Sequence, residues 1–142
     1  MKRATILCLC LFLSGTALAM TRVNSAQVND DFTAFWQSFK TAVVKGDKEA
    51  VVGLSRFPIR MPRRVRNIKD GADLRLRYRE VFNKNVNAAK CFATEKPADD
   101  PDNAKGKFVS CFDNLGDLFN YEFEHTGTGW RFVRLGRETL PD

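Results

Sequence analysis

The sequence predicts an α+β domain, with helices in its first half and an antiparallel sheet in its second half. Apolar residues recur with the 3.6-residue period of a helix in the first half, and from Ala88 onward they alternate with a period of two. One face of the predicted strands is strongly aromatic. Because such a face must be covered, we expect three N-terminal helices packed on a curved antiparallel sheet of four to five strands.

The first helix is predicted to follow Asn29-Asp30-Asp31, which offers an N-cap and acids for the first turn. Its apolar stripe recurs at i, i+3, i+4, i+7, i+10 and i+11 and consists of Phe32, Phe35, Trp36, Phe39, Ala42 and Val43. Gly46 ends the helix, because glycine readily takes the left-handed conformation that follows a helix C-terminus.

A second, shorter helix is predicted after Asp47, which can cap it. Its inner face carries Ala50, Val51 and Leu54. Pro58 ends this helix and favours an extended backbone at Phe57. Residues 57–62 alternate between apolar and polar, and the prolines at both ends exclude a central strand, so we expect a short edge strand.

A third helix and four strands complete the predicted domain. Asp70 caps the third helix, which ends at Asn83 or Asn85. Its inward positions are Leu74, Tyr78, Val81 and Phe82. The strands are predicted at residues 88–94, 107–112, 118–125 and 130–135.

Two tight turns fix the predicted register of these strands. In Thr126-Gly-Thr-Gly129, Gly127 can take the positive φ of a two-residue type II′ turn. That turn pairs His125 with Trp130, Glu124 with Arg131, Phe123 with Phe132, and Tyr121 with Arg134. A second turn at Leu115-Gly116 sets Phe112 opposite Phe119, Ser110 opposite Tyr121, and Phe108 opposite Phe123. The aromatic face then holds His125 and Arg134 together with Phe92, Phe108, Phe112, Phe119, Tyr121, Phe123, Trp130 and Phe132.

Residues 1–19 have the pattern of a cleavable secretory signal peptide. A basic pair at residues 2–3 precedes an apolar run at 4–13 and a small-residue tail that ends at Ala19. The apolar run is too short for a transmembrane helix, and no later segment is long enough. We therefore expect a periplasmic or secreted protein, with a disordered stub at 20–28, one domain at 29–137 and a C-terminal tail at 138–142.

The cysteine count agrees with export. Cys8 and Cys10 would leave with the signal peptide, and Cys91 and Cys111 would remain. A leftover pair in an oxidising compartment is usually a disulfide. The predicted register places the two cysteines opposite each other on adjacent strands, on the face away from the aromatic one.

The order of these elements resembles the nuclear transport factor 2-like (NTF2-like, cystatin-like) superfamily. The resemblance covers Asp30 to Leu135, closes on Gly129-Trp130-Arg131-Phe132, and is closest to exported bacterial members with no assigned activity. Its motifs are Phe35-Trp36-x-x-Phe39-Lys40, Lys45-Gly46-Asp47-Lys48, Phe57-Pro58 and Tyr78-x-x-Val81-Phe82. It implies a cone-shaped domain with a pocket between sheet and helices, a shape that serves isomerases, dehydratases, ligand binding and protein contacts.

Tyr121, His125 and Arg134 are the candidate catalytic residues. Superfamily enzymes pair a carboxylate or histidine base with a tyrosine or acid donor, and Tyr121 and His125 share one strand face. Arg134 falls where alternation predicts an apolar residue and could bind a carboxylate or phosphate. No acid here matches a catalytic one of the superfamily. Convergence of the three on an open pocket would favour a small-molecule isomerase, dehydratase or hydrolase, whereas a cone filled by aromatic rings would favour a non-catalytic module.

The densest charge lies between Arg56 and Arg79. This segment holds nine basic and two acidic residues, so its net charge is +7, whereas the rest of the chain after residue 19 has a net charge of −3. Eight of the nine basic residues are arginine, which suits planar anions. The predicted ligand-binding residues are Arg60, Arg63, Arg64 and Arg66. Because export argues against nucleic acid, we expect an anionic envelope polymer, a lipid phosphate or an acidic protein as the partner.

No metal site or cofactor is predicted. Asp99, Asp100 and Asp102 lie close together in a loop but lack the glycine and distant glutamate of an EF-hand. His125 is the single histidine of the chain. If the chain self-associates, we expect a homodimer through the uncovered face of the sheet. The sequence thus favours an exported, non-catalytic binding module over an enzyme.

Overall fold

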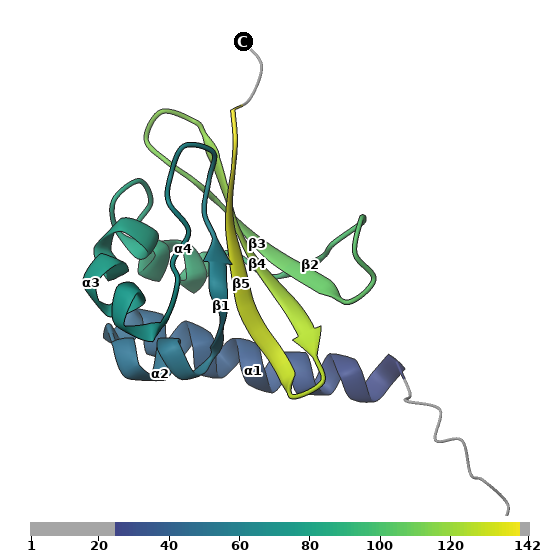
Figure 1. The fold of residues 1–142 in the computed structure, drawn as a ribbon. Helices are drawn as coiled ribbons and strands as arrows, with labels where there is room; N and C mark the ends of the chain where they lie inside the picture. The colour runs from purple at the N-terminus through teal and green to yellow at the C-terminus, as the bar shows by residue number, and fades with distance from the viewer. Residues whose placement is uncertain (1–24, 140–142) are drawn as a thin grey trace, which may run out of the picture.

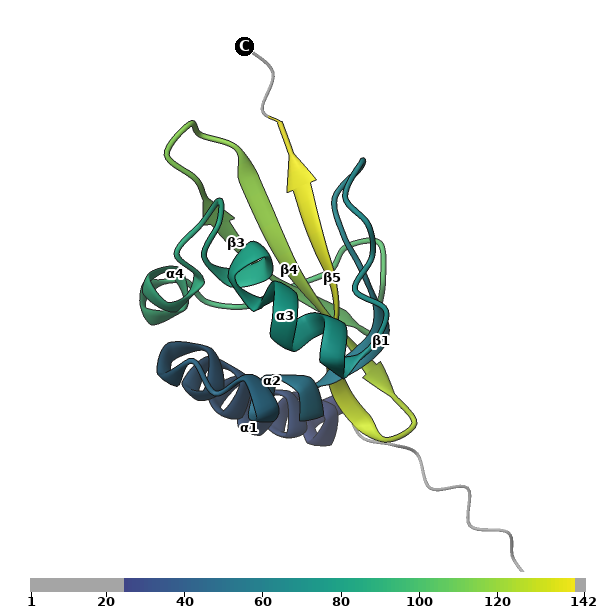
Figure 2. The same ribbon diagram turned by 60° about the vertical axis from the view of Figure 1, so that its left-hand side comes forward.

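The computed structural model describes residues 25–139, with side chains from Asp31 onward. In that part of the chain, four helices and a five-stranded sheet form two layers, with the helices on one face of a curved sheet (Figure 1, Figure 2). The α+β class and the mostly antiparallel sheet are confirmed. The predicted signal peptide at 1–19, and most of the stub at 20–28 and of the tail at 138–142, lie outside the described residues.

α1, Ser25–Lys45, provides one wall of the core. It begins before the expected N-cap at Asn29, because residues 25–28 contain neither the glycine nor the proline that would end a helix. The apolar stripe predicted for this helix is buried throughout, and Gly46 follows it with a φ of 66°. None of the helices within residues 25–139 has both the length and the apolar character needed to cross a bilayer.

The next three elements follow the predicted order. In α2, Lys48–Gly53, the Asp47 side chain accepts a hydrogen bond from the backbone of Ala50, and in α3, Gly71–Phe82, Asp70 accepts one from Asp73. Between them lies β1, Ser55–Arg60, at the edge of the sheet as the prolines require. The four predicted inner residues of α3 are buried.

The sheet has the strand order β1-β5-β4-β3-β2. β1 runs parallel to β5, and the other pairs are antiparallel. The remaining strands are β2, Ala98–Asp99; β3, Gly106–Phe112; β4, Leu118–Thr126; and β5, Gly129–Glu138. The C-terminal ends of β1 and β5 and the β3–β4 turn therefore lie at one end of the sheet, and the β4–β5 turn lies at the other (Figure 1).

The prediction of a strand at residues 88–94 is wrong, because this segment is helix α4, Ala88–Thr94. The Asn87 side chain caps the helix by accepting a hydrogen bond from the backbone of Lys90 at 3.0 Å. Ala88 and Phe92, four residues apart, are both buried against the core. The alanines of this segment favour a helix, and the Asn87 cap stabilises its first turn, so the segment is helical and not a strand.

The β4–β5 hairpin has the predicted register at its turn. Phe123 lies opposite Phe132, and His125 lies opposite Trp130. The positive φ, however, is at Gly129 and not at Gly127. The Thr126 hydroxyl instead organises the turn, donating to the Gly129 carbonyl at 2.8 Å.

The predicted register of β3 is wrong by one residue. Val109 lies opposite Tyr121, and Cys111 opposite Phe119, so Phe108 and Phe112 point away from the core. The cause is the turn, which takes five residues, 113–117, where the sequence predicted a tight one. Asp113 closes this longer turn, because its carboxylate accepts backbone hydrogen bonds from Leu115 and Asp117. A one-residue change of register moves every side chain to the other face.

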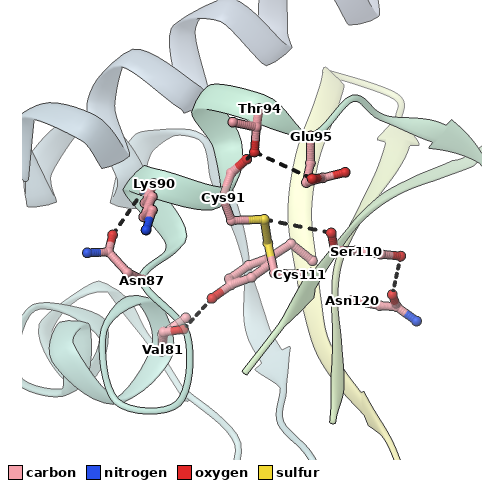
Figure 3. The surroundings of a disulfide bond; sticks show 10 residues. Val81, Asn87, Lys90, Cys91, Thr94, Glu95, Ser110, Cys111 and Asn120 are labelled. Carbon is pink, nitrogen blue, oxygen red and sulfur yellow. Dashed lines mark hydrogen bonds between the residues drawn. A yellow bond between two sulfur atoms is a disulfide. The ribbon is translucent and has the colours of Figure 1, made fainter. Parts of the chain in front are cut away.

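A disulfide between Cys91 and Cys111 is confirmed, with the two Cα atoms 5.9 Å apart. It joins α4 to β3 on the face covered by helices, whereas the sequence predicted a bridge between strands on the opposite face (Figure 3). The difference follows from the two corrections above: Cys91 is helical, and the shift in β3 turns Cys111 inward.

Candidate functional site

Tyr121 belongs to the core and does not line a pocket. Its side chain is fully buried, and its hydroxyl donates a hydrogen bond to the backbone carbonyl of Val81 at 2.9 Å. Val81 lies in the last turn of α3, where carbonyl groups have no partner within the helix. Burial raises the pKa of the Tyr121 hydroxyl, which therefore stays protonated. The residue thus ties a helix end to β4.

We expect Tyr121→Phe to lower the free energy of unfolding by about 1–2 kcal/mol, because it leaves the Val81 carbonyl buried without its donor. Urea titration followed by circular dichroism measures this loss. Unchanged stability would mean that the hydroxyl does not hold α3 to the sheet and is free for another role.

His125 lies at the end of β4, half-exposed, beside the turn to β5. Its ring makes an edge contact with Trp130 across the hairpin, with the ring centroids 5.5 Å apart. Its backbone N–H donates to the Lys105 carbonyl at 2.9 Å. The imidazole has no carboxylate partner among the described residues, so nothing there orients it as a general base.

The placement of Arg134 on the aromatic face is wrong. A bulge in β5 at Val133 leaves Phe132 opposite Phe123 but sets Arg134 opposite Glu122. Beyond the bulge the faces exchange, so Leu135 takes the inward position opposite Tyr121. Arg134 forms an ion pair with Glu122 on the outer face, with 3.5 Å between nitrogen and oxygen.

Tyr121, His125 and Arg134 therefore do not converge. One is in the core, one at a turn, and one on the outer face of the sheet. The space between sheet and helices, where the superfamily resemblance implies a pocket, is filled by aromatic rings. Those with at most 1% exposure are Phe39, Phe82, Phe92, Phe119, Tyr121, Phe123 and Phe132.

Five of the eight arginines of the basic segment form ion pairs, three of them with acids that are distant in sequence. Arg56 and Arg60 both reach Glu124 on β4, at 2.9 and 3.6 Å. Arg75 forms an ion pair with Glu49 on α2. Two of the predicted ligand-binding residues, Arg60 and the Asp73-bound Arg66, are thus engaged within the protein.

Asp73 is a buried acid that organises the basic segment from inside. Its carboxylate accepts hydrogen bonds from the Lys69 backbone at 3.0 Å and from Arg66 at 3.1 Å, and it lies 3.6 Å from Arg77. The Lys69 hydrogen bond, aided by the two guanidinium groups, lowers the pKa of Asp73. The sequence showed this acid only as one of two negative charges in the segment.

Arg63 and Arg64 form no ion pair among the described residues, and within the basic segment they share this with Arg79 on α3. Arg63 and Arg64 are adjacent in sequence and occupy the tip of a hairpin-like loop between β1 and α3. Ile59 and Ile68 exchange two backbone hydrogen bonds at its base, and the Val65 N–H donates to the Pro62 carbonyl at its tip. Both arginines are exposed. We call this feature, residues 62–65, the arginine tip.

The backbone of the arginine tip is unusual. Arg64 has a φ of 70°, the only positive φ of a non-glycine residue among the described residues. A left-handed conformation costs a side-chain-bearing residue roughly 1–2 kcal/mol. The hydrogen bonds at the base of the loop, together with one from the Met61 N–H to the Asn67 side chain, hold this conformation.

No protein-family model matches the chain, and no curated protein matches it in sequence. Solved structures do match. A domain of unknown function with a cystatin-like fold from Nostoc punctiforme superposes with a TM-score of 0.50, at 10% identity, over 84% of this chain and 81% of that one.

Two further structures are similar at lower scores. An NTF2-like protein with a cystatin-like fold from Novosphingobium aromaticivorans has a TM-score of 0.46 at 12% identity, over 81% of this chain and 83% of that one. A ketosteroid isomerase-like protein from Erwinia carotovora atroseptica has a TM-score of 0.47 at 14% identity, over 80% of this chain and 96% of that one. The match to the Nostoc punctiforme domain confirms the expected cystatin-like fold, and a shared fold does not by itself assign an activity.

Proposed function

We propose that this protein is an exported, non-catalytic binding module that holds an anionic component of the cell envelope at its arginine tip. The observation that carries the proposal is the contrast within the basic segment. Arg56, Arg60 and Arg66 are paired with acids, whereas Arg63 and Arg64 project from the tip and pair with no acid in the described part of the chain. The guanidinium groups of these two consecutive arginines are thus available to a partner.

The chemistry of arginine defines the partner as an oxyanion. A guanidinium is charged at every physiological pH and presents a planar fork of donors that matches phosphate, sulfate or carboxylate. The left-handed Arg64 supports the same interpretation, because a strained backbone at an exposed tip has no packing benefit to offset it. Strain of this kind is typical of loops that present side chains to a ligand.

The filled interior of the domain favours a binding role over a catalytic one. An enzyme of this shape needs a space where substrate meets a base and a donor, and here aromatic rings occupy the region between sheet and helices. The Tyr121 hydroxyl is already used by a backbone carbonyl. Export, which places the partner in the envelope, rests on the signal-peptide pattern of residues 1–19.

The proposal predicts that Arg63→Glu with Arg64→Glu weakens binding to an anionic surface about tenfold or more at low salt. Reversing two charges replaces attraction by repulsion, and tenfold corresponds to about 1.4 kcal/mol. Retention of the protein from Thr21 onward is measured on dextran sulfate resin and on phosphatidylglycerol vesicles. Binding should also weaken as salt screens the charges over about 8 Å at 0.15 M.

The matched control is Lys45→Glu with Lys90→Glu, two exposed lysines with no acid partner among the described residues and away from the tip. It changes the net charge by the same amount. If both variants are retained equally at every salt concentration, retention depends on total charge alone and the arginine tip is an ordinary solvated loop. Retention on resin but not on vesicles would assign a polymer as the partner.

A further inference from the structure

The surface is hollowed by a groove between α1 and the end of α4 with the residues that follow it. It has a volume of about 440 Å³, which is in the range of small-molecule sites. α1, residues 93–97 and the start of β3 line it. The groove is near the end of the sheet that carries the β4–β5 turn, because Gly106 at the start of β3 lies opposite Glu124. The arginine tip is at the other end, beyond β1.

The floor of this groove is aromatic. Phe32 and Trp36 line it, and both are more than 90% buried because their rings pack on Phe123 in the core. The indole N–H of Trp36 donates to no acceptor among the described residues, and its nitrogen is not sealed from the surface. The aromatic floor offers apolar surface to the body of a ligand, and the indole N–H lies where it can report a bound molecule.

The rim of the groove is cationic. Lys40, Lys96 and Lys107 line it, against the single carboxylate of Glu95. Lys107 is held in place, because its ammonium group pairs with Asp99 and lies 5.2 Å from the centre of the Phe32 ring. Lys40 and Lys96 have no acid partner in the described part of the chain. Two ammonium groups beside an apolar floor are thus left for an anion.

We propose that this groove, the lysine groove, binds an amphipathic carboxylate, with its acyl chain on Phe32 and Trp36 and its carboxylate between Lys40 and Lys96. Each half of the ligand meets a matching half of the site: burial of the chain removes apolar surface from water, and the ammonium groups neutralise the charge. Neutral alcohols gain only the first of these interactions. Short carboxylates gain only the second.

The test titrates decanoate, 1-decanol and acetate, all below the micelle concentration of decanoate, into the protein from Thr21 onward. Calorimetry gives affinity, and the indole N–H resonance of Trp36, assigned with Trp130→Phe, reports the site. We expect decanoate to bind and shift the Trp36 resonance. Acetate should not bind, and 1-decanol should bind at least tenfold more weakly than decanoate.

Two variants separate the halves of the site. Lys40→Gln with Lys96→Gln should weaken decanoate about tenfold and leave 1-decanol unchanged, whereas Lys45→Gln with Lys90→Gln should change neither. Ala93→Trp, at an exposed residue of α4 that lines the groove, should prevent decanoate binding without changing any charge. Thermal melting checks that each variant is folded.

Equal affinity for decanoate and 1-decanol, no shift of Trp36, or normal binding by Ala93→Trp would each overturn the proposal. The outcome is independent of the arginine tip, because Arg63→Glu with Arg64→Glu should bind decanoate as the unmodified protein does. If the Arg63→Glu with Arg64→Glu variant loses resin binding but keeps decanoate binding, the protein has both sites. If the unmodified protein is retained on resin but does not bind decanoate, the protein has only the arginine tip.

Discussion

Replacing Phe123 with alanine is expected to lower the free energy of unfolding by about 3–5 kcal/mol, the usual cost of truncating a buried aromatic residue. The Phe123 side chain is 0% exposed and packs against four rings of α1. Removal leaves a cavity among these four rings, and the lost contacts add to the lost burial. Urea denaturation followed by circular dichroism measures the change.

Phe112→Ala is the matched control, because it makes the same substitution on the next strand. Phe112 is 61% exposed on the outer face, so its loss should change stability by less than about 0.5 kcal/mol. The sequence-based register predicts large effects at both positions, and the observed register predicts a large effect only at Phe123. Similar losses for the two variants would contradict the observed register of β3.

The helices of the first half could be predicted in detail because their signals are local. The stripe of α1 repeats over three turns, and the caps Asp47 and Asp70 stand directly before the helices they begin. Each signal involves residues within four positions of one another, which is the range over which a helix forms its own hydrogen bonds. In a helix, the residues that interact with one another are therefore also close together in the sequence.

The sheet was predicted correctly only near its tight turn. From the β4–β5 turn the register holds as far as Phe123 and Phe132, and then the bulge at Val133 exchanges the faces. A bulge adds one residue without any change of composition, so alternation alone does not reveal it. The exposed Arg134 was its one visible sign: an arginine in an apolar position indicated that the alternation had shifted.

The candidate site could be predicted as a region but not residue by residue. The segment of Arg56 to Arg79 is basic in sequence, yet which arginines are free depends on Glu49 and Glu124, which the fold brings beside them. Glu124 is 68 positions from Arg56 along the chain. Only the structure shows that Arg63 and Arg64 lie beyond the reach of these acids.

Replacing Cys91 and Cys111 together with alanine is expected to lower the free energy of unfolding by about 3 kcal/mol. The bridge closes a loop of 20 residues. A cross-link over that length lowers the conformational entropy of the unfolded chain, which stabilises the folded state by about 3 kcal/mol. It is also the covalent link between α4 and the sheet (Figure 3). Chemical denaturation of the oxidised protein and of the double variant measures the difference.

Reduction provides the control for this prediction, because it opens the bridge without changing the sequence. Adding dithiothreitol should destabilise the unmodified protein by a similar amount and leave the double variant unchanged. The fold should survive, since Phe92 anchors α4 in the core independently of the bridge, 5.0 Å from the Tyr121 ring. If reduction left the stability of the unmodified protein unchanged, the cross-link would not constrain the unfolded chain, and packing around Phe92 alone would hold α4 on the sheet.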